Sequence, residues 1–277
     1  MLLVQFQKEQ SAIRNLASQS LKVVLSGEGA DEIFGGYNVY SEPGGSAYDK
    51  LPRGLRRGIG HIAEKMPAHR GRNFLVRKGK DLEERFIGNA YMFTPEERKA
   101  LLKIRTNAPD PMAITKPFYD KVQDQDDVTK MQYLDLHMWM AGDILLKADK
   151  MSMAHSLELR VPYLDREVFR EAETYPVSYK LRGDTKAVLR TAANKTLPDA
   201  WANRTKKGFP VPIAKWLEDP EFSAKVRKSF AGDVAGEYFD QNKLLAMLDD
   251  PRHERRKIWT AYTFLTWHEQ FFEKFDA

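Results

Sequence analysis

The clearest hydrophobic pattern near the start of the chain is a short run of β-branched residues followed by glycines. Residues 22–26 (KVVLS) have the length and composition expected of a buried strand. A glycine turn follows at residues 27–29, and residues 30–34 (ADEIF) predict a helix that stops at residues 35–36 (GG). A strand, a glycine turn and a helix start form the local geometry that places ligands at the carboxyl end of a parallel strand.

The remainder of the chain shows patterns typical of helices. Thr94 precedes Pro-Glu-Glu, which predicts an N-cap, a proline at the first helical position and an acidic first turn. Residues 131–153 are apolar almost all round and predict a helix inside the protein, whereas residues 105–128 are polar and predict a connection. We expect further helices over residues 11–20, from Asp165 onwards, from about Asp184 to Ala193, and over about 254–274.

This inventory contains one convincing strand and at least seven helices. A single parallel strand needs hydrogen-bonded neighbours, and no second strand is evident in the pattern. We therefore predict a mainly α-helical chain with a small remnant of a parallel β-sheet. The length of 277 residues suits one large domain, and we assign residues 1–277 to one.

Composition excludes several classes of function. The chain has no Cys, which excludes disulfides, thiolate metal sites and a Cys nucleophile, and which is compatible with the cytoplasm, the location we expect. The net charge of +5 suits a protein that handles polyanions such as ATP but does not demand nucleic acid, which we do not expect as a partner. No apolar run is long enough to cross a membrane, and the first residues do not resemble a signal peptide.

The glycine turn carries the strongest candidate chemistry. Gly27 and Gly29 allow a ligand to approach the backbone closely, and free N–H groups at a helix start favour an anion. The nearby carboxylates of Glu28, Asp31 and Glu32 would repel a phosphate unless Mg²⁺ lay between them, since Mg²⁺ binds carboxylate and phosphate oxygens together. The alternative is a structural turn before an acidic helix, and spacing alone favours that alternative.

Several blocks of sequence resemble one enzyme family. Residues 26–37 (SGEGADEIFGGY) resemble a characteristic motif of the asparagine synthetases and of the related β-lactam synthetases. Further blocks resemble the same family in the same order: residues 145–165, residues 180–190, residues 206–212 (KKGFPVP), and Trp259 with Trp267. Together these blocks cover roughly residues 20–270.

The resemblance implies both a fold and a reaction. The fold is part of an α/β adenine-nucleotide alpha-hydrolase-like domain, the PP-loop ATP pyrophosphatase type. The family's reaction uses ATP and Mg²⁺. The aspartate side chain attacks the α-phosphate to give β-aspartyl-AMP and pyrophosphate, and glutamine-derived ammonia then gives asparagine and AMP. The first step brings several negative groups together, so cations are useful to offset their charge. In the second step the attacking ammonia loses a proton, so a carboxylate base is useful to accept it.

The resemblance also assigns roles to individual residues in the turn. Glu28 matches the essential glutamate, placed as the base near the acyl-adenylate. Ser26, Gly27 and Gly29 match nucleotide contacts, and Asp31 matches the carboxylate that helps to hold Mg²⁺–pyrophosphate. For Glu32, a supporting role beside Glu28 and a purely structural role stay open.

Lys186 matches the family lysine that steadies charge on the phosphate or the adenylate. We expect Lys186 in the first turn of a helix capped by Asp184, where the helix dipole would assist its charge. Lys206 and Lys207 lie on a basic loop that either reaches pyrophosphate or is simply solvated.

Charged residues also surround the long apolar segment. Buried charges must be paired, so we expect a structural ion-pair network beneath the active site. Lys150 replaces the arginine usual in the family, and a Lys does not copy a bidentate guanidinium. The residues of this expected network are Lys147, Asp149, Lys150, Glu158 and Arg160.

The family pattern is incomplete within these residues. The pyrophosphate loop Ser-Gly-Gly-x-Asp-Ser does not occur, nor does the glutaminase domain with its leading Cys. We therefore expect the isolated chain not to make asparagine, and we expect an uncovered apolar sheet face that favours a homodimer. Two alternatives stay open: a β-lactam synthetase-like ligase with another substrate, and a non-catalytic nucleotide-binding or interaction module.

Overall fold

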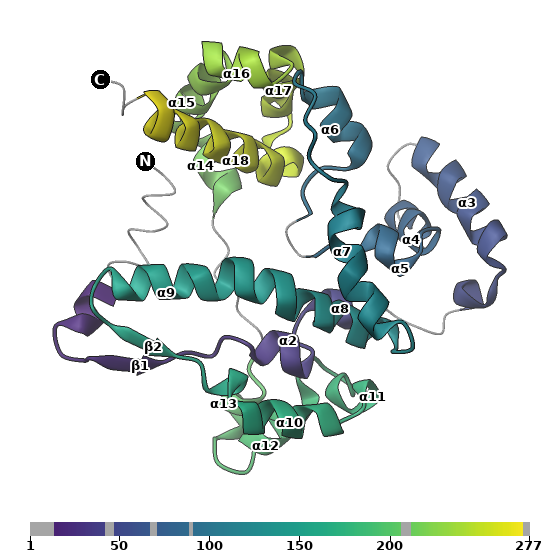
Figure 1. Cartoon of the computed structure of the whole chain (residues 1–277), viewed down its shortest axis with the longest axis vertical. Helices are drawn as coiled ribbons and strands as arrows, with labels where there is room; N and C mark the ends of the chain where they lie inside the picture. Colours follow the sequence, from purple (N-terminus) through teal and green to yellow (C-terminus); the bar gives the residue numbers. More distant parts are fainter. Residues whose placement is uncertain (1–13, 42–46, 67–70, 89–90, 206–211, 274–277) are drawn as a thin grey trace. The chain divides into compact units, whose positions relative to one another are not determined.

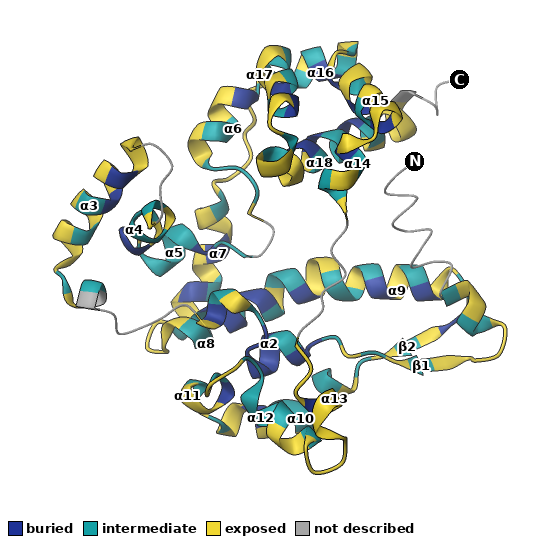
Figure 2. Ribbon diagram, turned by 180° about the vertical axis from the view of Figure 1, so that it is seen from behind, coloured by how far each residue is buried: buried dark blue, intermediate teal, exposed yellow. Residues whose placement is uncertain are grey.

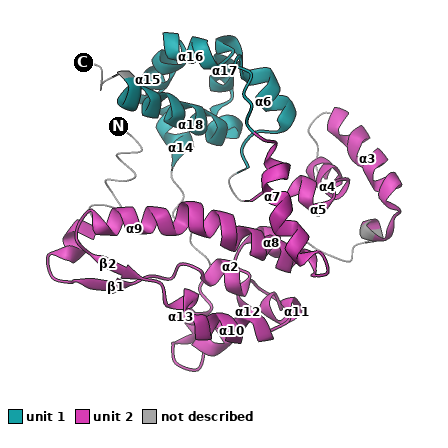
Figure 3. Cartoon of the chain, in the orientation of Figure 1, with its two compact units in different colours: residues 1–12, 91–108, 207–277 teal, residues 13–90, 109–206 magenta. Residues whose placement is uncertain are grey.

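The computed structural model describes residues 14–41, 47–66, 71–88, 91–205 and 212–273. These residues form many helices and one small sheet (Figure 1). The chain divides into two compact units, one of residues 1–12, 91–108 and 207–277 and the other of residues 13–90 and 109–206 (Figure 3). We call them unit 1 and unit 2.

The sheet of unit 2 has two parallel strands. Strand β1 (Val23–Leu25) pairs with β2 (Glu158–Arg160), with Val24 opposite Leu159. The ladder continues beyond β1, where the Ser26 amide donates to the Arg160 carbonyl at 2.8 Å. The predicted fold, mainly helical with a small parallel sheet, is therefore confirmed, and β2 is the partner strand that the sequence pattern did not reveal.

One face of this sheet is uncovered in the described structure. Leu25 is 73% exposed and Val23 is 39% exposed, while Val24 between them is half-buried (Figure 2). Alternate residues of a strand point to opposite faces, so Val23 and Leu25 share the exposed face. The predicted uncovered face is present among the described residues, but it is only partly apolar, because the exposed Glu158 and Arg160 of β2 lie opposite Val23 and Leu25.

A long helical stretch crosses unit 2 (Figure 1). It consists of α8 (Asp127–Leu134), a π-helical segment (Asp135–Ile144) and α9 (Leu145–Met153). The prediction that it lies wholly inside the protein is wrong, since Leu146 and Met153 are about half exposed. Asp143, Lys147 and Lys150 recur at helical spacing and give this stretch a polar side, which the apolar count obscured.

Shorter helices build the rest of unit 2. The predicted cap at Asp165 is confirmed, because its carboxylate accepts the Glu167 amide at 2.9 Å. The predicted connection over 105–128 is wrong in part, because Asp110 caps a helix there with Pro111 at its first position. These helices are α3 (Arg53–Lys65), α4 (Arg72–Lys78), α5 (Leu82–Arg85), α7 (Pro111–Tyr119), α10 (Arg166–Thr174), α11 (Val177–Lys180), α12 (Ala187–Ala193) and α13 (Asp199–Ala202).

Helix α2 (Ala30–Phe34) follows β1 and is almost entirely buried. Ile33 and Phe34 form a small core with Ala172 of α10, to which Leu164 and Val188 of neighbouring segments add partly buried contacts. This packing stabilises the position of the turn between β1 and α2, because a five-residue helix has little stability of its own.

Unit 1 is helical in its described part and has its own core, centred on Val226, Phe230, Leu244 and Ile258. The predicted N-cap at Thr94 is confirmed: its hydroxyl accepts the Glu97 amide at 3.2 Å, and the Glu97 side chain accepts the Thr94 amide at 2.9 Å. The helices are α6 (Pro95–Leu101), α14 (Ile213–Glu218), α15 (Pro220–Phe230), α16 (Asp233–Tyr238), α17 (Gln241–Ala246) and α18 (Pro251–His268). Throughout the described ranges, no helix has both the length and the apolarity needed to cross a bilayer.

Two glycines of α3 give a test of this packing. A methyl group on Gly60 would lie 2.9 Å from the Gly79 Cα of the neighbouring segment, whereas one on Gly58 meets nothing within 4 Å. We expect Gly60→Ala to destabilise unit 2 by about 1–3 kcal/mol through overpacking. Gly58→Ala should stabilise it by up to about 1 kcal/mol through helix propensity. Urea unfolding followed by circular dichroism measures both, and equal shifts of the same sign would contradict the close approach of α3 and α4.

Candidate active site

The turn between β1 and α2 is fixed by contacts of its own residues. The Ser26 amide is committed to β2, as described above, and its hydroxyl donates to Glu28 Oε2 at 3.0 Å. The same hydroxyl accepts the Glu28 amide at 3.3 Å. Ser26 therefore orients the half-buried Glu28 carboxylate, and its own N–H group, which bonds the Arg160 carbonyl, is not free for a ligand.

The two glycines of the turn have different surroundings. Gly27 is exposed, and a Cβ added there would meet nothing within 4 Å. Gly29 is buried in the left-handed region at φ +90°, and a Cβ added there would lie 2.6 Å from Leu164 Cδ2. Gly27 thus leaves the backbone open to a ligand, whereas Gly29 is required by the turn and by packing.

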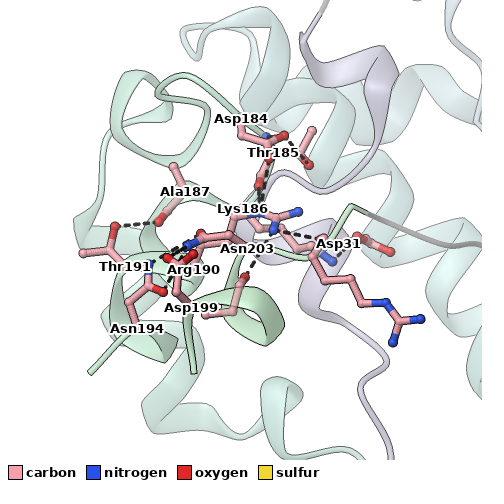
Figure 4. Close-up of polar contacts among 12 residues, drawn as sticks. Asp31, Asp184, Thr185, Lys186, Ala187, Arg190, Thr191, Asn194, Asp199 and Asn203 are labelled. Carbon is pink, nitrogen blue, oxygen red and sulfur yellow. Dashed lines mark hydrogen bonds and ion pairs between the residues drawn. The ribbon is translucent and has the colours of Figure 1, made fainter. Parts of the chain in front are cut away.

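Lys186 and Asp31 are brought together by α12 and α2. The Lys186 ammonium lies 2.9 Å from Asp31 Oδ1, and the two side chains are 21% and 26% exposed (Figure 4). The Lys186 amide also donates to the Gly35 carbonyl at 3.3 Å. The predicted lysine therefore contacts the helix that follows the glycine turn. In the described part of the chain, no hydrogen bond or ion pair joins Lys186 directly to Glu28.

The local backbone at Lys186 differs from the prediction. Lys186 has φ 57° and ψ 36°, in the left-handed region, and is itself the N-cap of α12. Asp184 instead accepts the amide of the adjacent Thr185 at 2.7 Å. The expected helix from Asp184, with Lys186 in its first turn, is therefore wrong: the helix begins at Ala187. A left-handed residue other than glycine is unusual, and it directs this lysine towards α2.

Arg190 is a supporting residue to which the sequence analysis gave no role. Its Nη1 donates to the carbonyls of Ala202 and Arg204 at 3.2 and 3.1 Å, and its Nε donates to the Thr185 carbonyl at 3.0 Å (Figure 4). One guanidinium thus ties the segment before Lys186 to the end of α13. Its position four residues after Lys186 was the available signal, since residues at this spacing share a helix face.

Glu32 has a structural environment. It is only 2% exposed, and the Tyr37 hydroxyl donates to its carboxylate at 2.6 Å. Gln132 of α8 donates to the Glu32 carbonyl at 2.6 Å. Burial, followed by the hydrogen bond to Glu32 and the charge of Glu32, raises the pKa of Tyr37 far above its usual value, so this hydroxyl stays protonated as a donor. Of the two roles left open for Glu32, these contacts favour the structural one.

The charges beside the long helix do not form the expected buried network. Arg160 Nε lies 2.8 Å from Glu158 Oε1, but both side chains are more than half exposed. Asp149 and Lys150 are exposed as well. The prediction failed because Glu158 and Arg160 are two residues apart in β2, so both side chains point to the same face of the strand, and that face is exposed. Lys206 and Lys207 lie outside the described residues.

Comparison with known proteins identifies the family of this chain. The family model described as asparagine synthase matches residues 10–269. The chain belongs to the asparagine synthase family. It is 43% identical to asparagine synthetase [glutamine-hydrolyzing] 1 of Bacillus subtilis strain 168. The alignment of 265 residues covers 93% of this chain and 42% of that relative.

Other members of the asparagine synthase family and more distant amidases are also similar. A putative asparagine synthetase [glutamine-hydrolyzing] of Mycobacterium bovis is 42% identical over 93% of this chain and 40% of its own length. Amidase chry2 of Gibberella zeae is 25% identical over 73% of this chain and 34% of its own length. The chain thus spans about two fifths of the length of the synthetases that it matches.

The donor atoms present fit Mg²⁺ only in part. Among the described residues, no group of three His, Cys, Asp or Glu side chains is placed to hold a metal ion. Mg²⁺ in nucleotide sites usually takes one or two carboxylates and fills its other positions with phosphate oxygens and water. The lone carboxylate of Asp31, which contacts Lys186 through Oδ1, fits that mode.

The contrast between Gly27 and Gly29 is directly testable in this chain. Gly29→Ala should destabilise unit 2 by about 1–3 kcal/mol, because it adds left-handed strain and a contact with Leu164. Gly27→Ala should leave the free energy of unfolding within about 0.5 kcal/mol of the parent, as expected at an open surface position. Urea denaturation measures both. A Gly29→Ala protein as stable as Gly27→Ala would refute the structural role given to Gly29.

Proposed function

We propose that this chain is the adenylating, amide-forming part of an ATP-dependent carbon–nitrogen ligase that converts aspartate to asparagine. The observation that carries the proposal is the ion pair between Lys186 and Asp31. It brings a cation that suits phosphate and a carboxylate that suits Mg²⁺ to the helix after the glycine turn. The printed names of the relatives that are 42–43% identical, asparagine synthetase [glutamine-hydrolyzing], support the choice of substrates.

In the first step, an oxygen of the aspartate side-chain carboxylate forms a bond to the α-phosphorus of ATP. The bond from that phosphorus to the bridging oxygen breaks, and pyrophosphate leaves with the electron pair. Lys186 offsets the negative charge that gathers on the phosphate oxygens, and the open backbone at Gly27 admits the nucleotide. Mg²⁺, when bound through Asp31, supplies further neutralisation of the phosphate charge.

In the second step, ammonia forms a bond to the acyl carbon of β-aspartyl-AMP, and AMP leaves with the oxygen. The attacking nitrogen must lose a proton, and Glu28 accepts it as the general base. Ser26 donates to Oε2 of Glu28, so one carboxylate oxygen is held while the other remains able to receive the proton. The ammonia derives from glutamine, as the relatives' names indicate for those proteins.

Other features of the predicted enzyme stay proposals. We assign residues 1–277 to a single synthetase domain in which the two compact units are subdivisions. Inactivity of the isolated chain, a cytoplasmic location and a homodimer stay predictions, as do the nucleotide-contacting roles of Lys206 and Lys207. The β-lactam synthetase-like and non-catalytic alternatives have no observation that favours them over asparagine formation.

A chimera tests the reaction. In the chimera, the aligned part of this chain replaces the 265-residue aligned segment of the B. subtilis relative. The chimera is supplied with aspartate, ammonia and MgATP, and the asparagine and AMP that form are measured. We expect activity, and we expect Glu28→Gln to lower the rate by about 10²- to 10⁴-fold, the usual contribution of a general base. Glu167→Gln, at an exposed position of α10, is the matched control and should leave the rate unchanged.

Two outcomes of the chimera assay would count against the proposal. A chimera that is folded by circular dichroism but forms no asparagine would contradict the proposed reaction. Full activity in the Glu28→Gln chimera would remove Glu28 from the role of base while leaving the reaction in place.

Nucleotide binding tests the site in the chain itself. Isothermal titration with MgATP should show that Lys186→Ala weakens binding by at least about tenfold, because a charged contact to phosphate is lost. Lys116→Ala is the control, since Lys116 lies in α7 of the same unit and pairs with Asp120 at the surface. Equal affinity of the Lys186→Ala and parent proteins would separate Lys186 from the nucleotide site.

A further inference from the structure

A cavity lies in unit 2, between α11 and α12. It has a volume of about 520 Å³, and its lining residues include Tyr175, Tyr179, Arg182, Val188, Thr191 and Lys195. This volume is within the range of about 300–1,000 Å³ that is typical of small-molecule sites. No role has been given to this cavity in the reaction above.

The wall of the cavity combines aromatic rings with a guanidinium. The guanidinium carbon of Arg182 lies 5.9 Å from the centre of the Tyr179 ring, a distance at which cation and ring attract one another. Tyr175 lies on the same cavity. Tyrosine rings offer a flat surface on which a planar ligand stacks, and an arginine suits a phosphate or carboxylate group.

The charge of the cavity is positive. Its lining residues include Arg182 and Lys195 but no carboxylate, and neither cation forms an ion pair with any residue that the structure describes. Tyr175, one of the lining residues, donates its hydroxyl to Glu171 at 2.7 Å. Two cations without a carboxylate partner, one of them over the Tyr179 ring, favour an anionic ligand.

The cavity is separate from the candidate active site, although both use α12. Ala187, Val188, Thr191 and Ala192 line the cavity, and this spacing places them on one face of a helix. Figure 4 shows Ala187 and Thr191 on the side of α12 away from Asp31, towards which Lys186 points. A ligand in the cavity therefore contacts α12 without replacing the contact between Lys186 and Asp31.

We propose that this cavity is a binding site for a small aromatic anion of the nucleoside monophosphate class. The planar base packs against the tyrosines, and the phosphate lies near Arg182 and Lys195. The inference goes beyond the ligase reaction and does not depend on it, because it rests on the cavity alone.

Fluorine NMR of the chain labelled with 3-fluorotyrosine tests the proposal at the site itself. The Tyr175 and Tyr179 resonances are assigned from Tyr175→Phe and Tyr179→Phe, and the probes are AMP, adenosine and inorganic phosphate. We expect AMP to shift both resonances saturably. Adenosine and phosphate should each bind at least about tenfold more weakly, because each offers only half of the contacts, and tenfold corresponds to about 1.4 kcal/mol.

Variants complete the test. Arg182→Gln should weaken AMP binding by at least about tenfold through loss of a charged contact, whereas Arg170→Gln, at the exposed surface of α10, should not change it. Absence of any AMP-dependent shift of Tyr175 and Tyr179, binding of phosphate alone as tight as AMP, or indifference to Arg182→Gln would each overturn the proposal. Shifts confined to Tyr37 or Tyr163 would also overturn it, because they would place the nucleotide only beside the segments that carry the glycine turn.

Discussion

The candidate site depends on one electrostatic contact, the ion pair between Lys186 and Asp31. Both side chains are largely removed from solvent, where an opposite charge is worth more than at an exposed surface. The contact joins a helix after β1 to a segment far along the chain, and removal of either partner would leave the other charge poorly solvated. In the proposed reaction a bound phosphate offers Lys186 a second anion, so the same ammonium would both stabilise the fold and contact the ligand.

Neighbouring contacts fix both segments that carry this ion pair. Helix α2 is too short to be stable alone, and it is held by Ile33 and Phe34 in an apolar core and by the Tyr37 hydroxyl on the buried Glu32. Arg190 stabilises the position of α12 in a similar way, because its guanidinium donates hydrogen bonds to three backbone carbonyls. Hydrogen bonds of this kind around buried groups rigidify their surroundings, which is the property that a site for charged reactants needs.

Local patterns predicted the parts of the fold that local physics determines. The strand before the glycine turn and the caps at Thr94 and Asp165 each depend on a few neighbouring residues, and all are present. Strand β2 was not predictable in this way, because three residues with charges at both ends show no apolar run. The left-handed backbone of Lys186 and the difference between Gly27 and Gly29 depend on residues distant in sequence, so the motif alone treats both glycines alike.

The parallel pairing of β1 with β2 has a consequence for how the chain folds. Pairing Val24 with Leu159 closes a loop of roughly half the chain. Contacts between such distant residues form slowly, because closing the loop costs conformational entropy before the strand hydrogen bonds form. Helical segments such as α3 and α18 need no distant partner to begin forming. The sheet edge, and with it the glycine turn, should therefore be completed late, after most helices already exist.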